Sequence, residues 1–149
     1  MQVQLLSSAP EIMKEDELFY VGQKAFIDKG GEVLVLNDPV LGLDFPGGKI
    51  QEGERDFDEA LKREVKEETD LEIEIGSPFT RWSYLLTHGH SHAGKTIYLI
   101  GFRCKYVSGN IKLSNEHDGF RWVNKDNYKE RVEIDNGYFR ALEKYFEGA

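Results

Sequence analysis

The stretch GKIQEGERDFDEALKREVKEETDL, residues 48–71, decides the fold of the middle of this chain. Asp56 and Glu59 form a capping box, in which two residues satisfy the free N–H groups at the start of a helix. The box predicts a helix that begins at about Phe57 and ends at about Thr69.

The apolar positions of this helix fall in one stripe, which we expect to pack on a sheet. Two carboxylates, those of Glu64 and Glu68, fall within the stripe, and Glu67 lies at its edge. A run of charges usually marks a solvated helix face, but a solvated face does not place carboxylates among packing residues. We therefore expect Glu64 and Glu68 to point inward. The apolar members of the stripe are Phe57, Ala60, Leu61 and Val65.

Such a group of carboxylates is unfavourable unless a cation lies between them. Glu64 and Glu68 are like charges four residues apart, and all three glutamates lie near the negative end of the helix dipole. A hard divalent cation removes both penalties, and carboxylates without Cys or His suit Mg²⁺ or Mn²⁺. The spacing does not resemble a calcium-binding loop, so we expect a catalytic magnesium site.

The composition is that of an ordinary globular chain. Its 149 residues, 40% hydrophobic and 31% charged, predict one domain over residues 1–149. Of the net charge of −8, a balance of −7 lies between Glu52 and Glu74, in eleven acidic and four basic residues. This acidity argues against a nucleic-acid polymer as partner, and no apolar run is long enough to span a bilayer. Without a secretory signal, we expect a cytoplasmic protein.

Strand patterns surround the helix. We predict strands over residues 19–26, 33–36, 71–75, 82–87, 96–102 and 120–123, and a final helix over 136–146 that begins at an Asn cap. Residues 37–45 are predicted to be a loop that leads to Pro46, Gly47 and Gly48. More strand than helix, with helices packed on a mixed sheet, indicates the α+β class.

The same stretch resembles the Nudix box, G-x5-E-x7-R-E-U-x-E-E-x-G-U, where U is an aliphatic residue. The matching positions are Gly48, Glu54, Arg63, Glu64, Val65, Glu67, Glu68 and Leu71, and the preceding Phe45-Pro46-Gly47-Gly48-Lys49 also fits the family. A motif of this length has few chance matches. The resemblance implies a Nudix-like α/β/α sandwich.

The chain departs from the family pattern at two positions. Eight residues rather than seven separate Glu54 from Arg63, but Asp56 keeps the helix cap seven residues before the Arg. The extra residue, Arg55, therefore lengthens the loop and leaves the helix register unchanged. Asp70 replaces the family's Gly at the helix end, where we expect a positive φ that Asp tolerates at a modest stability cost.

The resemblance implies Mg²⁺-dependent hydrolysis of a nucleoside diphosphate linked to another group X, by water attack on a pyrophosphate phosphorus. It implies that Glu64, Glu67 and Glu68 bind the metal, with the Gly47 carbonyl as a further ligand. Arg63 would orient a metal-binding glutamate, and Glu54 would support the loop. The general base would be Glu64 or a carboxylate from another loop, for which Glu116 is the candidate.

Substrate identity is less well defined by the sequence. Residues 113–122, LSNEHDGFRW, are similar to a stretch in dinucleoside polyphosphate hydrolases of the family. His88, His90 and His92 alternate in a loop and either contact phosphates or form a solvated hairpin tip. Trp82 and Tyr84 either stack on a base or belong to the core.

Two alternative functions stay open beside the hydrolase. A silent Nudix-like domain would bind nucleotide as a sensor, although such domains typically lose box glutamates that this chain keeps. A Nudix-fold isoprenoid diphosphate isomerase would need an active-site cysteine, and the lone Cys104 has no accompanying nucleophile pattern and is predicted to be structural. A small-molecule nucleotide pyrophosphate is the expected partner, and homodimerisation stays open.

Overall fold

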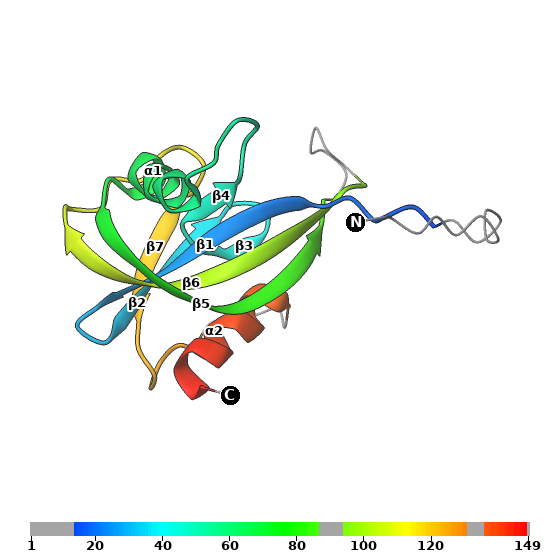
Figure 1. Cartoon of the computed structure of the whole chain (residues 1–149). Helices are drawn as coiled ribbons and strands as arrows, with labels where there is room; N and C mark the ends of the chain where they lie inside the picture. Colours follow the sequence, from blue (N-terminus) through cyan, green and yellow to red (C-terminus); the bar gives the residue numbers. More distant parts are fainter. Residues whose placement is uncertain (1–13, 87–93, 131–135, 149) are drawn as a thin grey trace, which may run out of the picture.

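A mixed β-sheet forms the middle layer of the structure (Figure 1), a computed structural model that describes residues 14–86, 94–130 and 136–148. Its strands follow the order β3-β2-β1-β6-β5, with β4 paired to β1 and β7 paired to β2. The pairing of β1 with β6 is parallel and the other pairings are antiparallel. The strands are β1 (Tyr20–Lys29), β2 (Glu32–Asp38), β3 (Gly42–Asp44), β4 (Gly47–Lys49), β5 (Glu72–Leu85), β6 (Thr96–Ser108) and β7 (Gly119–Val123).

Two helices, α1 (Phe57–Thr69) and α2 (Gly137–Glu147), cover opposite faces of this sheet (Figure 1). Successive residues of β1 point to opposite faces, so Ala25 and Ile27 pack with α1 whereas Phe26 packs with α2. The sheet is therefore buried on both sides, and the expected α+β sandwich is confirmed. Among the described residues, no helix is long and apolar enough to cross a membrane.

Helix α1 has the bounds that the capping box predicts. The Asp56 side chain accepts a hydrogen bond from the Glu59 N–H at 3.1 Å. At the other end, Asp70 adopts φ 64°, and its N–H donates to the Lys66 carbonyl at 2.9 Å. The left-handed conformation expected at Asp70 is thus present.

The prediction that Phe57 packs on the sheet with the rest of the apolar stripe is wrong. Phe57 is 49% exposed, because it lies in the first turn of α1, whereas the buried part of the helix begins at Ala60. The inward orientation of Glu68 is confirmed, since only 4% of this residue is exposed.

The predicted strands 19–26 and 96–102 are too short, since β1 continues to Lys29 and β6 to Ser108, and two other regions differ more from the structure. The predicted loop over residues 37–45 contains β3, and β4 follows at Gly47; both are three-residue strands that depend on their neighbours rather than on a pattern of their own. The predicted strands 71–75 and 82–87 merge into β5, which pairs with the long β6 through register shifts on both sides of Pro78. These irregularities hide the continuous strand from a search for alternation.

Candidate active site

The inward carboxylates of α1 lie against the glycines of β4. The Gly47 N–H donates to Glu68 Oε1 at 3.3 Å. A Cβ added to Gly48 would lie 2.8 Å from Glu64 Cδ, and one added to Gly47, at φ 139°, would collide with the Gln23 carbonyl oxygen. Glycine at residue 48 therefore allows the backbone to approach Glu64, and glycine at residue 47 allows it to approach β1.

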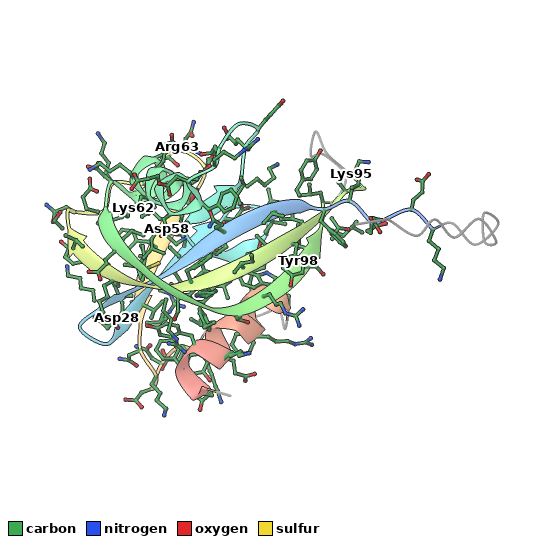
Figure 2. The ribbon with its side chains drawn as sticks, viewed as in Figure 1. Asp28, Asp58, Lys62, Arg63, Lys95 and Tyr98 are labelled. Carbon is green, nitrogen blue, oxygen red and sulfur yellow. The ribbon has the colours of Figure 1, made fainter. Side chains whose placement is uncertain are left out.

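Arg63 binds three carboxylates at the edge of the site. Its Nη2 donates to Glu54 Oε2 at 3.1 Å and to Glu64 Oε1 at 3.3 Å, and its Nη1 donates to Glu67 at 3.1 Å. Glu54 also accepts the Gln51 N–H at 2.8 Å. The additional Arg55 therefore does not move Glu54 away from the site (Arg63 is labelled in Figure 2).

The segment before β7 adds two side chains from the other end of the sequence. One ligand atom each of Glu68, Glu116 and His117 lies within 4.8 Å of the other two. The structure therefore brings Glu116, the candidate outside the box, alongside the box carboxylates. It also adds His117, which the sequence analysis did not select.

Lys24, Asp44 and His117 form a buried charged cluster beneath these carboxylates. Lys24 Nζ lies 3.0 Å from Asp44 Oδ1, and His117 Nε2 lies 2.8 Å from Asp44 Oδ2. Lys24 also donates to the Phe45 carbonyl at 3.2 Å and to the Gly47 carbonyl at 3.5 Å. The sequence contains two signals for this cluster. Lys24 interrupts an apolar run of β1, and Asp44 directly precedes Phe45-Pro46.

The cluster stabilises its own charges. Burial alone would raise the pKa of Asp44 and lower the pKa of Lys24. The attraction between the two charges outweighs burial, so the pKa of Asp44 lies below its ordinary value and the pKa of Lys24 lies above its own. Burial lowers the pKa of His117, but the hydrogen bond and charge of Asp44 outweigh it and raise the pKa overall. The fixed charges hold the Gly47 backbone that faces Glu68.

For Glu64 and Glu68 of the Nudix box, burial outweighs the stabilising effect of the neighbouring positive charges. Burial raises the pKa of Glu68 to about 8, with Asp44 adding to the rise and Lys24 opposing it. Burial also raises the pKa of Glu64, against the effect of Arg63. Crowded carboxylates that resist ionisation fit a divalent cation, because a cation stabilises their charged form. The donor set of carboxylates and a nearby backbone carbonyl suits Mg²⁺ or Mn²⁺.

The remaining candidates are one exposed carboxylate at the edge of the site and several residues away from it. Glu67 is bound by Arg63, and 58% of its side chain is exposed. Trp82 and Tyr84 pack against Tyr138 in the core on the α2 side. Cys104 is buried in the α1-side core, where burial raises the pKa of its thiol to about 12, as expected of a structural cysteine. His88, His90 and His92 lie outside the described residues.

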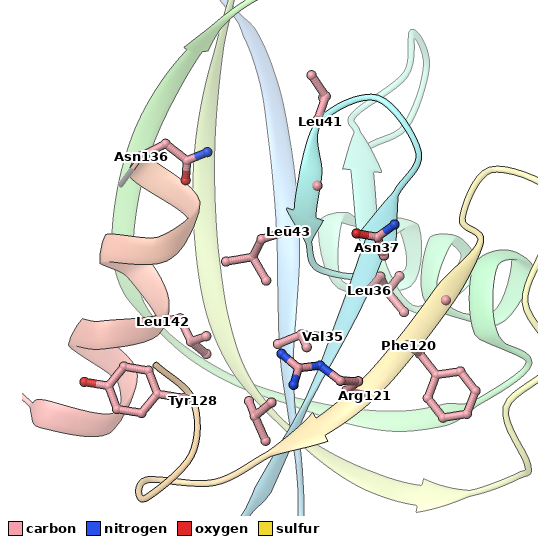
Figure 3. A pocket seen from close by; sticks show the side chains of 13 residues that line it. Val35, Leu36, Asn37, Leu41, Leu43, Phe120, Arg121, Tyr128, Asn136 and Leu142 are labelled. Atoms are coloured by element: carbon pink, nitrogen blue, oxygen red, sulfur yellow. The ribbon is translucent and has the colours of Figure 1, made fainter. Parts of the chain in front are cut away.

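A cavity of about 400 Å³ opens on the α2 side of the sheet, between β2, β3, β7 and α2 (Figure 3). Asn37 and Arg121 contribute polar groups, and Leu43, Tyr128 and Leu142 contribute apolar walls. Asn37 Nδ2 donates to Asp118 Oδ1 at 2.6 Å, which joins the cavity to the segment that carries Glu116 and His117.

Comparison with known proteins agrees with this architecture. A family model described as the NUDIX domain matches residues 24–144. The chain belongs to the Nudix family, whose enzyme class is that of hydrolases acting on phosphorus-containing acid anhydrides. A comparison with the curated proteins found no match.

Solved structures of the same fold include a MutT protein from Methanosarcina mazei Go1. It is 28% identical over 90% of this chain and 96% of its own, with a TM-score of 0.71. A NUDIX hydrolase from Nitrosomonas europaea is 22% identical over 88% and 90%, with a TM-score of 0.67. An Ap4A hydrolase from C. elegans is 19% identical over 87% and 99%, with a TM-score of 0.62. At the last two identities, the likeness concerns the fold alone.

Proposed function

We propose that this protein hydrolyses the pyrophosphate bond of a nucleoside diphosphate linked to another group, with Mg²⁺ or Mn²⁺ as cofactor. The observation that supports this function most strongly is that Glu64, Glu68 and Glu116 lie close together next to β4. When bound, a divalent cation neutralises the phosphates and lowers the pKa of the attacking water. The residues described in the next paragraphs bind the cation and orient the groups around it.

Glu64, Glu67 and Glu68, with the Gly47 carbonyl, are the proposed metal ligands. Arg63 keeps Glu54, Glu64 and Glu67 together, so their carboxylates do not move apart under mutual repulsion. The Gly47 N–H orients Glu68, and Lys24 fixes the Gly47 carbonyl from behind. This arrangement is preorganised, because backbone and buried charges hold the reactive side of the site.

The proposed general base is Glu64 or Glu116. The pKa of Glu64 is raised by burial, which brings it closer to the pH at which a base accepts a proton from water. Glu116 is exposed and lies next to Glu68 and His117, from where it reaches the same side of the site. Exchange of each for glutamine distinguishes them by the dependence of the rate on pH at saturating Mg²⁺, because only loss of the base removes the rise of the rate with pH.

The cavity beside β7 is the proposed site for the nucleoside or the X group. Its volume of about 400 Å³ is in the range of small-molecule pockets. Arg121 and Asn37 supply hydrogen-bond donors, while Leu43 and Leu142 supply apolar contact (Figure 3). The C. elegans Ap4A hydrolase, which has the same fold, supports a nucleotide as the substrate class.

Several broader expectations belong to the same proposal. We propose a single domain over residues 1–149 that works in the cytoplasm on small molecules, either alone or as a homodimer. The net charge of −8 supports a small, metal-bound substrate rather than a nucleic-acid polymer.

The test is turnover of a panel of nucleoside triphosphates, nucleotide sugars, ADP-ribose and dinucleoside polyphosphates with Mg²⁺, in water enriched in the heavy oxygen isotope. Release of a nucleotide product with one heavy oxygen in a phosphate group is the expected result. Binding without turnover across the panel would support the sensor instead. The isomerase is disfavoured, because Cys104 is buried in the core and its thiol resists ionisation.

A further inference from the structure

His117 has one ring nitrogen that the protein satisfies and one that it leaves without a partner. The residue is only 7% exposed, and its Nε2 lies 2.8 Å from Asp44 Oδ2. Its Nδ1 is fully buried and has no hydrogen-bond partner among the described residues. A buried nitrogen without a partner is unfavourable whether it carries a lone pair or a proton, so a further group is needed to complete it.

The unpartnered nitrogen belongs to a ring that lies beside Glu68, a proposed metal ligand, and Glu116, a candidate general base. A ring nitrogen of His117 lies within 4.8 Å of carboxylate oxygens of both Glu68 and Glu116. Ligands of one metal ion lie about this far apart or closer, since each is roughly 2 Å from the ion. Because Asp44 engages Nε2, Nδ1 is the nitrogen that remains to bind.

The contact with Asp44 is the second sign of a metal ligand. Histidines that bind a metal through one nitrogen almost always donate the other N–H to a carboxylate or carbonyl, which fixes the tautomer and makes the binding nitrogen more basic. Asp44 is in that position, and Lys24 holds its carboxylate at 3.0 Å. Neither residue is part of the Nudix box.

We propose that His117 Nδ1 is a ligand of the divalent cation, beside Glu68 and Glu116, and that it favours Mn²⁺ over Mg²⁺. The proposal rests on the proposed function, because it assigns a further ligand to the same site. Imidazole nitrogen suits borderline transition ions, whereas Mg²⁺ prefers oxygen. A site of carboxylates with one histidine nitrogen therefore favours Mn²⁺ over Mg²⁺.

A second group of possible ligands around the same histidine does not compete with this assignment. Ligand atoms of Asp38, Asp44 and His117 also lie within 4.8 Å of one another. A cation among them would lie next to the Lys24 ammonium, which is 3.0 Å from Asp44. Both Asp44 oxygens are also already engaged, Oδ1 by Lys24 and Oδ2 by His117, so the side of Glu68 and Glu116 is the one that is free to bind.

The test is pulsed electron spin resonance of the full chain loaded with Mn²⁺. A directly bound nitrogen modulates the spin echo, and labelling the histidines with the heavy nitrogen isotope changes the modulation in a known way. The chain has only four histidines, so replacing His88, His90 and His92 together with Asn leaves His117 as the only labelled residue. We expect the isotope-dependent modulation in the wild type and in this triple variant, and its loss in His117→Gln.

Titration of free Mn²⁺ provides the second readout. His117→Gln should weaken Mn²⁺ binding at least tenfold and Mg²⁺ binding by a smaller factor, whereas the triple variant should bind both as the wild type does. Bound Mn²⁺ without histidine modulation in the wild type overturns the proposal and leaves the proposed function standing. Absence of Mn²⁺ and Mg²⁺ binding to the wild type overturns both. If His117→Gln does not fold, the labelled triple variant alone decides the assignment.

Discussion

Replacement of Glu68 by glutamine should change how the stability of the metal-free protein depends on pH. The folded protein raises the pKa of Glu68 from 4.5 to about 8, chiefly by burial. Between these two values the folded state binds more protons than the unfolded state, so the free energy of unfolding falls as pH rises and levels off above about pH 8. A glutamine in the same place does not titrate and keeps the shape of the neutral acid.

The size of the effect follows from the two pKa values. At about 1.4 kcal/mol for each pKa unit, ionisation of buried Glu68 costs on the order of 5 kcal/mol. Near pH 5 the wild type and Glu68→Gln should therefore have similar stabilities. Near pH 9 the variant should be more stable by up to that amount, or roughly 10–20 °C in Tm for a chain of this length.

The assay is thermal unfolding followed by circular dichroism between about pH 5 and pH 9, with a chelator present. Glu59→Gln is the matched control, because Glu59 lies on the same helix with 67% of its side chain exposed. Its difference from the wild type should stay nearly constant with pH. If the Glu68→Gln difference is equally constant, the carboxylate is not destabilised by burial and the reasoning is refuted.

Three further substitutions test other parts of the structure. Arg63→Lys should lower kcat at least tenfold with little change in Tm, because a lysine cannot bind the carboxylates of Glu54, Glu64 and Glu67 together; wild-type kcat would contradict this. Gly48→Ala should weaken Mg²⁺ binding in a calorimetric titration, since its Cβ would lie 2.8 Å from Glu64 Cδ; unchanged affinity would contradict the close approach. Asp70→Gly should raise the free energy of unfolding in urea by roughly 0.5–1 kcal/mol at unchanged turnover, because the residue adopts φ 64°; a decrease would show that its contact with Lys66 matters more.

The sequence predicted α1 well because its signals are local. The cap at Asp56, the inward position of Glu68 and the positive φ of Asp70 depend on residues within a few helical turns. The same periodicity overestimated the burial of Phe57. Periodicity shows which side of a helix faces the sheet, but it does not show where along the helix the contact with the sheet begins.

The second half of the site could not be read from local patterns. Lys24, Asp44 and His117 are far apart in the sequence and meet only through the pairing of β1, β2 and their neighbours. A lone histidine before a strand carries no signal until the structure shows its buried, unpartnered nitrogen. Glu116 was selected by its place before β7, and the structure puts it beside Glu68.

The most direct test of the central claim is the initial rate of nucleotide pyrophosphate hydrolysis against Mg²⁺ concentration, for the wild type, Glu68→Gln and Glu59→Gln. The wild type should have no activity in chelator and a rate that saturates with Mg²⁺. Glu68→Gln should lose orders of magnitude at saturating Mg²⁺, because a neutral amide is a poor ligand for a hard cation, while Glu59→Gln should match the wild type. Equal rates for Glu68→Gln and the wild type would contradict a metal-dependent active site at these carboxylates.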